Sequence, residues 1–181
     1  MRFLPTKFAD AWLISLEPHG DERGSFARTF CEREFAAHGL ATRFVQHSVS
    51  HSKTEGTIRG MHFQRAPHQE EKVVCCLSGR LYDVIIDLRP TSPTFKQWQG
   101  FMLTAATGDR LYIPKGFAHG FQALAENTAT GYLISEYYSP ADAAGVRYDD
   151  SAFCISWPMP PTVVSEKDRL WPDFQSECCP P

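Results

Sequence analysis

The sequence lacks the patterns that mark several common classes of protein. No His-x-His pair occurs, and a strand would separate the closest histidines, His47 and His51, by about 13 Å, which is too far for one metal ion to bind both. No Gly-x-Ser-x-Gly turn marks a serine nucleophile. No apolar run is long enough to cross a membrane, and there is no internal repeat or low-complexity segment. A metal site is therefore not predicted, because it would need a ligand cluster that only the fold could assemble.

The N-terminal segment also lacks the features of a secretory signal peptide. Residues 1–18 are interrupted by Arg2, Lys7 and Asp10 and contain no long apolar core with a small-residue cleavage site. The chain is longer than disulfide-stapled mini-domains, so its six cysteines are expected to be reduced thiols and the protein to be cytoplasmic. A net charge of −3 argues against a general surface for nucleic acid or anionic membranes, so local cations must bind any phosphate.

The length and the spacing of short apolar runs favour one all-β domain. A chain of 181 residues can bury a single core, which we assign to residues 1–181 with a flexible tail from about residue 173. A convincing helix in the first half is predicted only at Cys31–His38, which ends at Gly39. The predicted strands cover residues 44–50, 57–64, 73–77, 81–88, 98–104, 110–114, 117–124 and 132–138. Many short strands without alternating helices favour a jelly roll with short peripheral helices.

Four connecting segments carry more specific expectations. Residues 19–24 are expected to form a polar turn, and Ser78-Gly79 to join its two flanking strands as a hairpin. The region 148–181 is rich in proline and tryptophan and is expected to wrap the barrel. Within it, Ser165–Asp168 matches a capping box for a final helical turn.

The stretch Arg59-Gly-Met-His-Phe-Gln, followed by Lys72, is the core of the candidate site. Gly60 permits a close approach that a Cβ would block, so Arg59 and His62 can reach a common pocket. Arginine offers a planar fork to phosphate, histidine exchanges a proton near neutral pH, and lysine can place a positive charge on a developing enolate oxygen. These residue types suit an anionic carbonyl substrate.

Three distant residues can join this site, although each also has a structural explanation. His119 lies among small residues and can be a buried, satisfied histidine, while Tyr132 can be an ordinary aromatic strand residue. Asp168 can serve as a helix cap. Their significance is collective rather than individual.

Several motifs occur in a defined order along nearly the whole chain. They are Arg59 to Gln64, Pro67-His68 with Lys72, Asp83 to Arg89, Ser92 to Phe95, Pro114 to Phe121, Tyr137 to Pro140, and Ile155 to Pro158. In this order and spacing they resemble the dTDP-4-dehydrorhamnose 3,5-epimerase family, and a set of motifs is more specific than any one of them.

The resemblance implies a cupin-type jelly roll (a double-stranded β-helix), a homodimer with strand exchange, and no metal or organic cofactor. It also implies a nucleotide-linked 4-keto-6-deoxyhexose as substrate, usually dTDP-4-dehydro-6-deoxyglucose on the route to rhamnose in surface polysaccharide. His62 would be the base beside the ketone, Asp168 its partner, Tyr132 the acid on the opposite face and Lys72 the enolate stabiliser. Inversion at carbon needs a base on one face and a proton donor on the other, so these roles are chemically consistent.

Other positions match the family's substrate contacts, and some depart from them. The positions that correspond to the family's substrate contacts, whether or not the residue type is the same, are Arg23, Phe26, Arg28, Gln46, Ser48, Arg59, His119, Tyr138 and Lys167. Arg28 stands where the family usually has glutamate, His47 and Ser48 where it has Asp-Asn, Leu133 where it has lysine, and Ala143 or Ala144 where it has an acid. These departures lie at positions that contact the substrate, whereas the predicted catalytic residues are retained.

Four alternatives remain open from the sequence. The enzyme could invert one centre only, or act on a differently linked nucleotide sugar, since Arg28 reverses a charge at a substrate-contact position. More remote alternatives are a catalytically idle sugar-binding cupin and a metal-dependent cupin. The joint presence of His62, Lys72, Tyr132 and Asp168 counts against the idle protein, and chelation would distinguish the metal enzyme.

Overall fold

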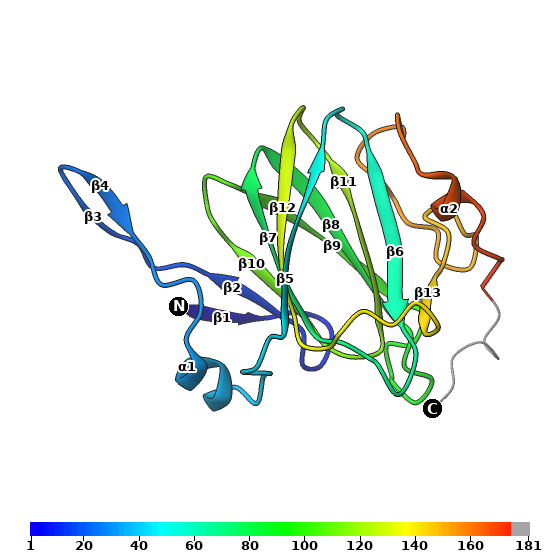
Figure 1. Cartoon of the computed structure of the whole chain (residues 1–181), viewed down its shortest axis with the longest axis horizontal. Helices are drawn as coiled ribbons and strands as arrows, with labels where there is room; N and C mark the ends of the chain where they lie inside the picture. The colour runs from blue at the N-terminus through cyan, green and yellow to red at the C-terminus, as the bar shows by residue number, and fades with distance from the viewer. Residues whose placement is uncertain (175–181) are drawn as a thin grey trace.

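The computed structural model describes residues 1–174, which form two packed antiparallel β-sheets, a two-stranded arm and two short helices (Figure 1). The six-stranded sheet has the order β1-β2-β10-β7-β12-β5, and the five-stranded sheet has the order β13-β6-β11-β8-β9. The strands of the sheets are β1 (Arg2–Pro5), β2 (Trp12–Ser15), β5 (Gln46–Ser52), β6 (Ile58–Gln64), β7 (Lys72–Ser78), β8 (Arg80–Asp87), β9 (Trp98–Thr104), β10 (Arg110–Ile113), β11 (Phe117–Ala123), β12 (Thr128–Ile134) and β13 (Ala143–Gly145). From β5 to β13, every connection except β8–β9 passes from one sheet to the other. The predicted all-β jelly roll is confirmed.

The core lies between the two sheets because apolar residues alternate along the strands. In β7, Val74 and Cys76 pack inward with Leu111 of β10 and Phe121 of β11. Val73, which precedes Val74, faces outward and belongs to a second apolar cluster. The period of two in the sequence thus sets the two faces of this strand.

The predicted helix at residues 31–38 is confirmed as α1 (Glu32–Ala37), with Cys31 and His38 at its ends. Phe35 is its fully buried residue and packs in the outer cluster with Val73 and Tyr112. The helix therefore covers part of the outer face of the six-stranded sheet and leaves the inner face to the cavity described below.

The predicted hairpin at Ser78-Gly79 is wrong. β7 pairs with β10 and β12, whereas β8 pairs with β9 and β11, so the chain changes sheets at Gly79. Gly79 has a φ of +77°, and a Cβ there would lie 2.7 Å from Oγ1 of Thr128. Alternating apolar residues show which side of a strand is buried but not which strand pairs with it.

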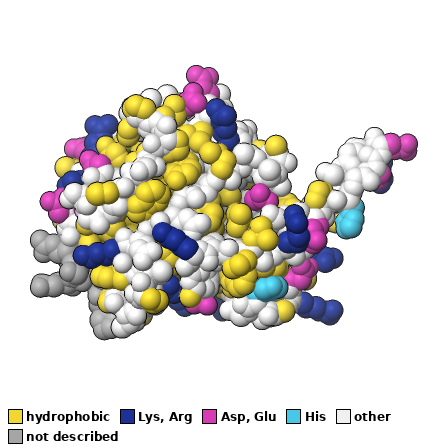
Figure 2. Space-filling model, turned by 180° about the vertical axis from the view of Figure 1, so that it is seen from behind, with side chains coloured by type: hydrophobic (Ala, Val, Ile, Leu, Met, Phe, Trp, Pro, Cys, Tyr) yellow, Lys and Arg dark blue, Asp and Glu magenta, His cyan; other side chains and the backbone are white. Residues whose placement is uncertain are grey.

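Two other boundaries also differ from the prediction. The strand predicted at residues 132–138 begins earlier, as β12 (Thr128–Ile134). The polar turn predicted at residues 19–24 is the tip of a hairpin formed by β3 (His19–Asp21) and β4 (Gly24–Phe26). This arm projects from the body of the molecule in both views, and all its strand residues are exposed (Figures 1 and 2).

The C-terminal region wraps the sandwich as expected. Phe153 packs in an outer cluster against the five-stranded sheet, and Val164 forms a parallel bridge with Ile58 of β6. At the start of the tail, Asp173 pairs with Arg147 and Phe174 packs near Phe153. The flexibility predicted from about residue 173 stays a prediction. The remainder of that predicted tail, residues 175–181, lies outside the described residues.

Candidate active site

A cavity of about 650 Å³ opens between the two sheets and brings most of the predicted site residues together. The predicted residues that line it are Gln46, Ser48, Arg59, His62, Lys72, His119, Tyr132, Tyr138, Lys167 and Asp168. His62 and His119 are cross-strand neighbours in the five-stranded sheet, whereas Lys72 and Tyr132 come from the six-stranded sheet. The two sheets therefore supply different walls of one cavity.

His62 and Asp168 form a hydrogen-bonded pair at one wall. Nε2 of His62 lies 2.6 Å from Oδ1 of Asp168, and Oδ2 of Asp168 accepts a longer hydrogen bond from the Gly60 N–H at 3.3 Å. Burial opposes ionisation of Asp168, but the hydrogen bond and charge of His62, with the Gly60 and Ser165 contacts, lower the pKa of Asp168 below its usual value. Asp168 is thus an anion that orients the imidazole and can stabilise its protonated form.

The helix that carries Asp168 uses half of the predicted capping box. α2 (Glu166–Arg169) begins after Ser165, whose Oγ accepts a hydrogen bond from the Asp168 N–H at 3.1 Å. The Asp168 carboxylate bonds to His62 and Gly60 instead of reaching back to the helix start. Ser165 is therefore the helix cap, and the Asp168 side chain is the partner of His62 rather than a cap.

Gly60 makes the approach of β6 to β11 possible. Its φ is +112°, and a Cβ would lie 2.6 Å from Cα of Gly120 and 2.7 Å from the carbonyl oxygen of His119. A side chain at this position would push apart the strands that carry His62 and His119. The close approach expected from the sequence is confirmed.

Tyr132 lies on β12, in the sheet opposite His62. Its hydroxyl is 3.3 Å from Oγ of Ser50, and burial raises the pKa of Tyr132 to about 12. The Ser50 hydrogen bond offsets this effect only in part. The phenol therefore remains protonated at neutral pH and can act as a proton donor.

Lys72 is held by a carboxylate that sequence reasoning missed. Nζ of Lys72 lies 2.9 Å from Oε1 of Glu70, and their side chains are only 13% and 7% exposed. Both residues line the cavity. The next residue, Glu71, accepts a hydrogen bond from Ser135 and lies 3.9 Å from Lys115. No local signal distinguishes the two adjacent glutamates, and both precede β7, so the alternation of side chains in the strand does not assign them to a side.

His119 is anchored by a second missed acid, Asp83. Nε2 of His119 lies 2.9 and 3.1 Å from the two carboxylate oxygens, and both residues are buried. Burial raises the pKa of Asp83, although the interactions with His119 and Lys72 act in the opposite direction. Asp83 begins one of the sequence motifs, and its side chain orients His119 in the cavity wall.

Two further predicted cations, Arg59 and Lys167, line the same cavity. Arg59 donates from Nε to Oγ of Ser52 at 3.2 Å and from a terminal nitrogen to the carbonyl oxygen of His51 at 2.8 Å. Nζ of Lys167 lies 5.5 Å from the ring of Trp171, a cavity residue that sequence reasoning also missed. These two cations give the cavity local positive charge for an anionic group.

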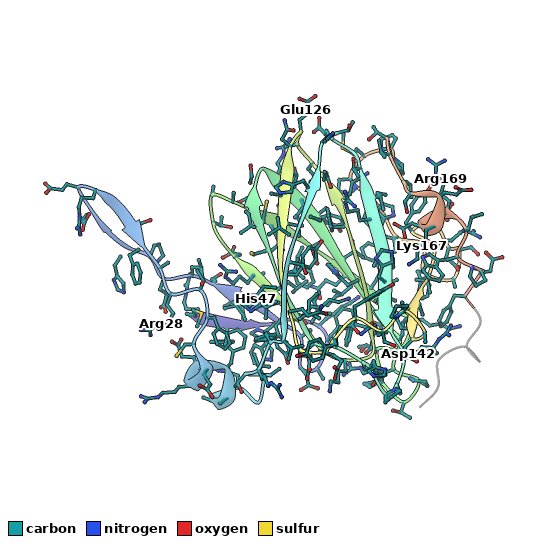
Figure 3. All side chains as sticks on the ribbon, viewed as in Figure 1. Arg28, His47, Glu126, Asp142, Lys167 and Arg169 are labelled. Carbon is teal, nitrogen blue, oxygen red and sulfur yellow. The ribbon has the colours of Figure 1, made fainter. Side chains whose placement is uncertain are left out.

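Three predicted substrate contacts lie away from the cavity of their own chain. Arg23 and Phe26 are on the projecting arm, where they are 85% (side chain) and 75% exposed, and Arg23 pairs with Asp21. Arg28 follows the arm and lies 3.3 Å from Glu34 of α1. Figure 3 shows Arg28 near the foot of the arm and Lys167 on the far side of the sandwich.

Two surveys of the described part of the chain bear on other classes of site. Among residues 1–174, no group of three or more His, Cys, Asp or Glu side chains is arranged to hold a metal ion. Within the same residues, no helix is long and apolar enough to cross a membrane. The cysteines within this range, Cys31, Cys75, Cys76 and Cys154, are free thiols.

Comparison with known proteins gives one consistent family. The family model described as dTDP-4-dehydrorhamnose 3,5-epimerase matches residues 5–176. The dTDP-4-dehydrorhamnose 3,5-epimerase of Methanothermobacter thermautotrophicus is 40% identical over 94% of this chain and 92% of its own. The dTDP-4-dehydrorhamnose 3-epimerase of Streptomyces niveus is 35% identical over 93% of this chain and 82% of its own. The crystal structure of the 3,5-epimerase from Bacillus anthracis, with TDP and PPi bound, has a TM-score of 0.92 and 42% identity over 96% of this chain and 99% of the other.

Proposed function

The chain belongs to the dTDP-4-dehydrorhamnose 3,5-epimerase family, and we propose that it inverts C3 and C5 of dTDP-4-dehydro-6-deoxyglucose to form dTDP-4-dehydrorhamnose. The observation that carries the proposal is that His62, paired with Asp168, and Tyr132 lie on opposite sheets around one cavity. Lys72 lines the same cavity. Epimerisation requires this division between a base and an acid.

His62 is the base in the first step. Its Nε2–H donates to the Asp168 anion, which leaves the lone pair of Nδ1 to accept a proton from C3 or C5. The electrons of the broken C–H bond move onto the C4 oxygen and form an enolate. Asp168 stabilises the imidazolium that results, because its carboxylate remains ionised beside the ring.

Lys72 and Tyr132 complete the reaction. The Lys72 ammonium donates a hydrogen bond to the enolate oxygen, which lowers the barrier for proton removal. Tyr132 then gives its proton to the opposite face of the carbon, and the enolate collapses to the ketone with inverted configuration. Proton exchange with solvent restores the phenol and the neutral imidazole, so the chain is unchanged after each inversion.

The arm supports a homodimer as part of the proposal. Phe26 is a large apolar side chain that is 75% exposed on a hairpin without a core of its own. Burial against a second copy would remove this area from water and bring Arg23 and Phe26 to the partner's cavity. In that arrangement Arg23 binds the diphosphate of the substrate and Phe26 packs against its nucleotide base. The cytoplasmic location remains a prediction from the sequence.

Inversion at C3 alone is the second candidate. It is favoured by the Streptomyces niveus relative, which is named as a 3-epimerase. The catalytic residues needed for one inversion or two are the same, so the product must decide between them.

The decisive experiment is incubation with dTDP-, UDP-, GDP- and CDP-linked 4-keto-6-deoxyglucose in D₂O, with the products resolved by NMR. We expect deuterium at C3 and C5 and double inversion of the dTDP sugar, with slower reaction of the others. Deuterium and inversion at C3 alone would favour the second candidate, and absence of exchange with every sugar would contradict an epimerase. A sample dialysed against a strong chelator serves as the test for a metal-dependent cupin, and we expect it to retain full activity.

A further inference from the structure

Glu70 presents a buried carboxylate to the cavity, and only one of its two oxygens has a partner. Its side chain is 7% exposed, and Oε1 is bound by Lys72 at 2.9 Å. Oε2 is buried and has no hydrogen-bond partner among residues 1–174. A buried carboxylate oxygen without a donor carries a free-energy cost, so this acceptor is suited to a donor brought by a ligand.

Glu70 lies just before β7, and its side chain is directed into the cavity. Glu70 and Lys72 are two positions apart and both line the cavity, whereas Glu71 between them bonds to Ser135 outside the cavity lining. The ion pair with Lys72 also limits the freedom of the Glu70 side chain. Its acceptor is therefore located beside the ammonium that contacts the substrate.

The chemistry of the substrate identifies the donor, if the function proposed above is correct. Lys72 binds the oxygen of C4, whose two neighbours are C3 and C5. In a 4-keto-6-deoxyhexose, C3 carries a hydroxyl group and C5 carries a methyl group. Of these two neighbours, only C3 thus offers a hydrogen-bond donor next to the C4 oxygen.

We propose that Glu70 accepts a hydrogen bond from the C3 hydroxyl through Oε2 and thereby acts as a specificity-determining residue for an α-hydroxy ketone. The ketone accepts from Lys72 while the adjacent hydroxyl donates to Oε2 of Glu70, so a substrate donor–acceptor pair meets a lysine and a carboxylate that are already held together through Oε1. A sugar without the C3 hydroxyl leaves the buried carboxylate oxygen unpaired, and such a loss discriminates strongly between substrates. This inference rests on the proposed function, which supplies the position of the C4 oxygen.

The test is a cycle that removes each partner of the proposed hydrogen bond in turn, because in Glu70→Gln the amide oxygen pairs with Lys72 and an N–H₂ group, which cannot accept, replaces Oε2. Deuterium exchange at C5 is measured for the 4-keto-6-deoxy sugar and its 3-deoxy analogue, both dTDP-linked, with the wild-type protein and Glu70→Gln. Exchange at C5 does not itself require the C3 hydroxyl, so it reports binding and orientation. We expect the wild type to prefer the 3-hydroxy sugar by about 10–100-fold in kcat/KM, and Glu70→Gln to treat the two sugars alike within about threefold.

The controls separate this inference from the proposed function and from a structural role. Glu71→Gln should keep the full preference of the wild type, and dTDP alone should bind wild type and Glu70→Gln equally. Equal use of the two sugars by the wild type, or an undiminished preference in Glu70→Gln, would show that Oε2 is met by water and would overturn the inference. If Glu70→Gln does not fold, the inference is tested by the wild type alone, through its preference for the 3-hydroxy sugar over the 3-deoxy analogue in exchange at C5. Absence of exchange with either sugar in the wild type would instead refute the epimerase.

Discussion

Nε2 of His62 and Oδ1 of Asp168 lie 2.6 Å apart, although 106 residues separate them in the chain. β6 carries the histidine and α2 carries the aspartate, and the C-terminal region brings them together by pairing with β6 at Ile58 and Val164. The region that wraps the sandwich is therefore part of the proposed catalytic arrangement, because it carries the residue that orients the proposed base.

Replacement of His62 by glutamine should abolish deuterium exchange at both C3 and C5. Glutamine retains similar size but cannot accept the proton, and loss of a general base typically reduces the rate by about 10²–10⁴-fold. The measurement is NMR of the dTDP sugar in D₂O, with dTDP affinity measured by calorimetry. The exposed His51→Gln is the control and should behave as the wild type. Exchange at the wild-type rate in His62→Gln would rule out this base.

Tyr132→Phe should separate exchange from inversion. Removal of the proton by His62 remains possible, but the donor on the opposite face is lost, so we expect exchange at C3 or C5 to exceed net inversion. Because burial raises the pKa of Tyr132 to about 12, deprotonation of this phenol should not limit the wild type below about pH 11. Both quantities come from the same NMR time course. Equal and complete loss of both would argue that Tyr132 and His62 do not have separate roles.

Asp168→Asn should lower both stability and activity, with the stability difference dependent on pH. The pKa of Asp168 is lowered in the folded protein, so its ionised form contributes stability above its unfolded pKa of about 3.9, and this contribution is lost as pH falls through the folded value. We expect the wild type to exceed the variant by about 1–2 kcal/mol at pH 7. Urea denaturation from pH 7 to pH 3 should show that the stability difference between wild type and Asp168→Asn shrinks below about pH 4. A difference that grows in acid would contradict the assigned ionisation.

Mixed dimers should reveal whether the arm acts on the partner. Phe26→Asp damages the arm and His62→Gln damages the base, so each variant alone should be nearly inactive. In a hybrid dimer, the intact arm of one subunit meets the intact base of the other, and random association should restore about a quarter of the wild-type activity. Co-expression followed by the activity assay provides the measurement. A mixture of His62→Gln with Tyr132→Phe should show no such recovery, since every cavity lacks one residue, and absence of recovery with Phe26→Asp would refute the exchange.

Local patterns were sufficient for most of the elements. The period of two located the strands around Val74 and Cys76, and the turn residues separated them. The helix around Phe35 and the cap at Ser165 followed from chemistry within one turn. The catalytic candidates were identified by their positions in motifs that resemble a known family, and their side chains are of types that can move protons or stabilise an enolate. These are properties of residues and of their immediate neighbours in the chain.

Tertiary structure alone decided which residues face one another. Glu70 and Glu71 are chemically identical neighbours, yet one lies in the cavity beside Lys72 and the other bonds to Ser135. The same limit explains the wrong hairpin at Gly79, since burial of an apolar face is satisfied by either sheet. The sequence by itself determined the all-β pattern, which depends on local periodicity, and it predicted the candidate site residues through motifs whose order along the chain resembles a known family. Pairing of strands, the contact between His62 and Asp168, and the partner of Lys72 depend on packing between segments far apart in the chain.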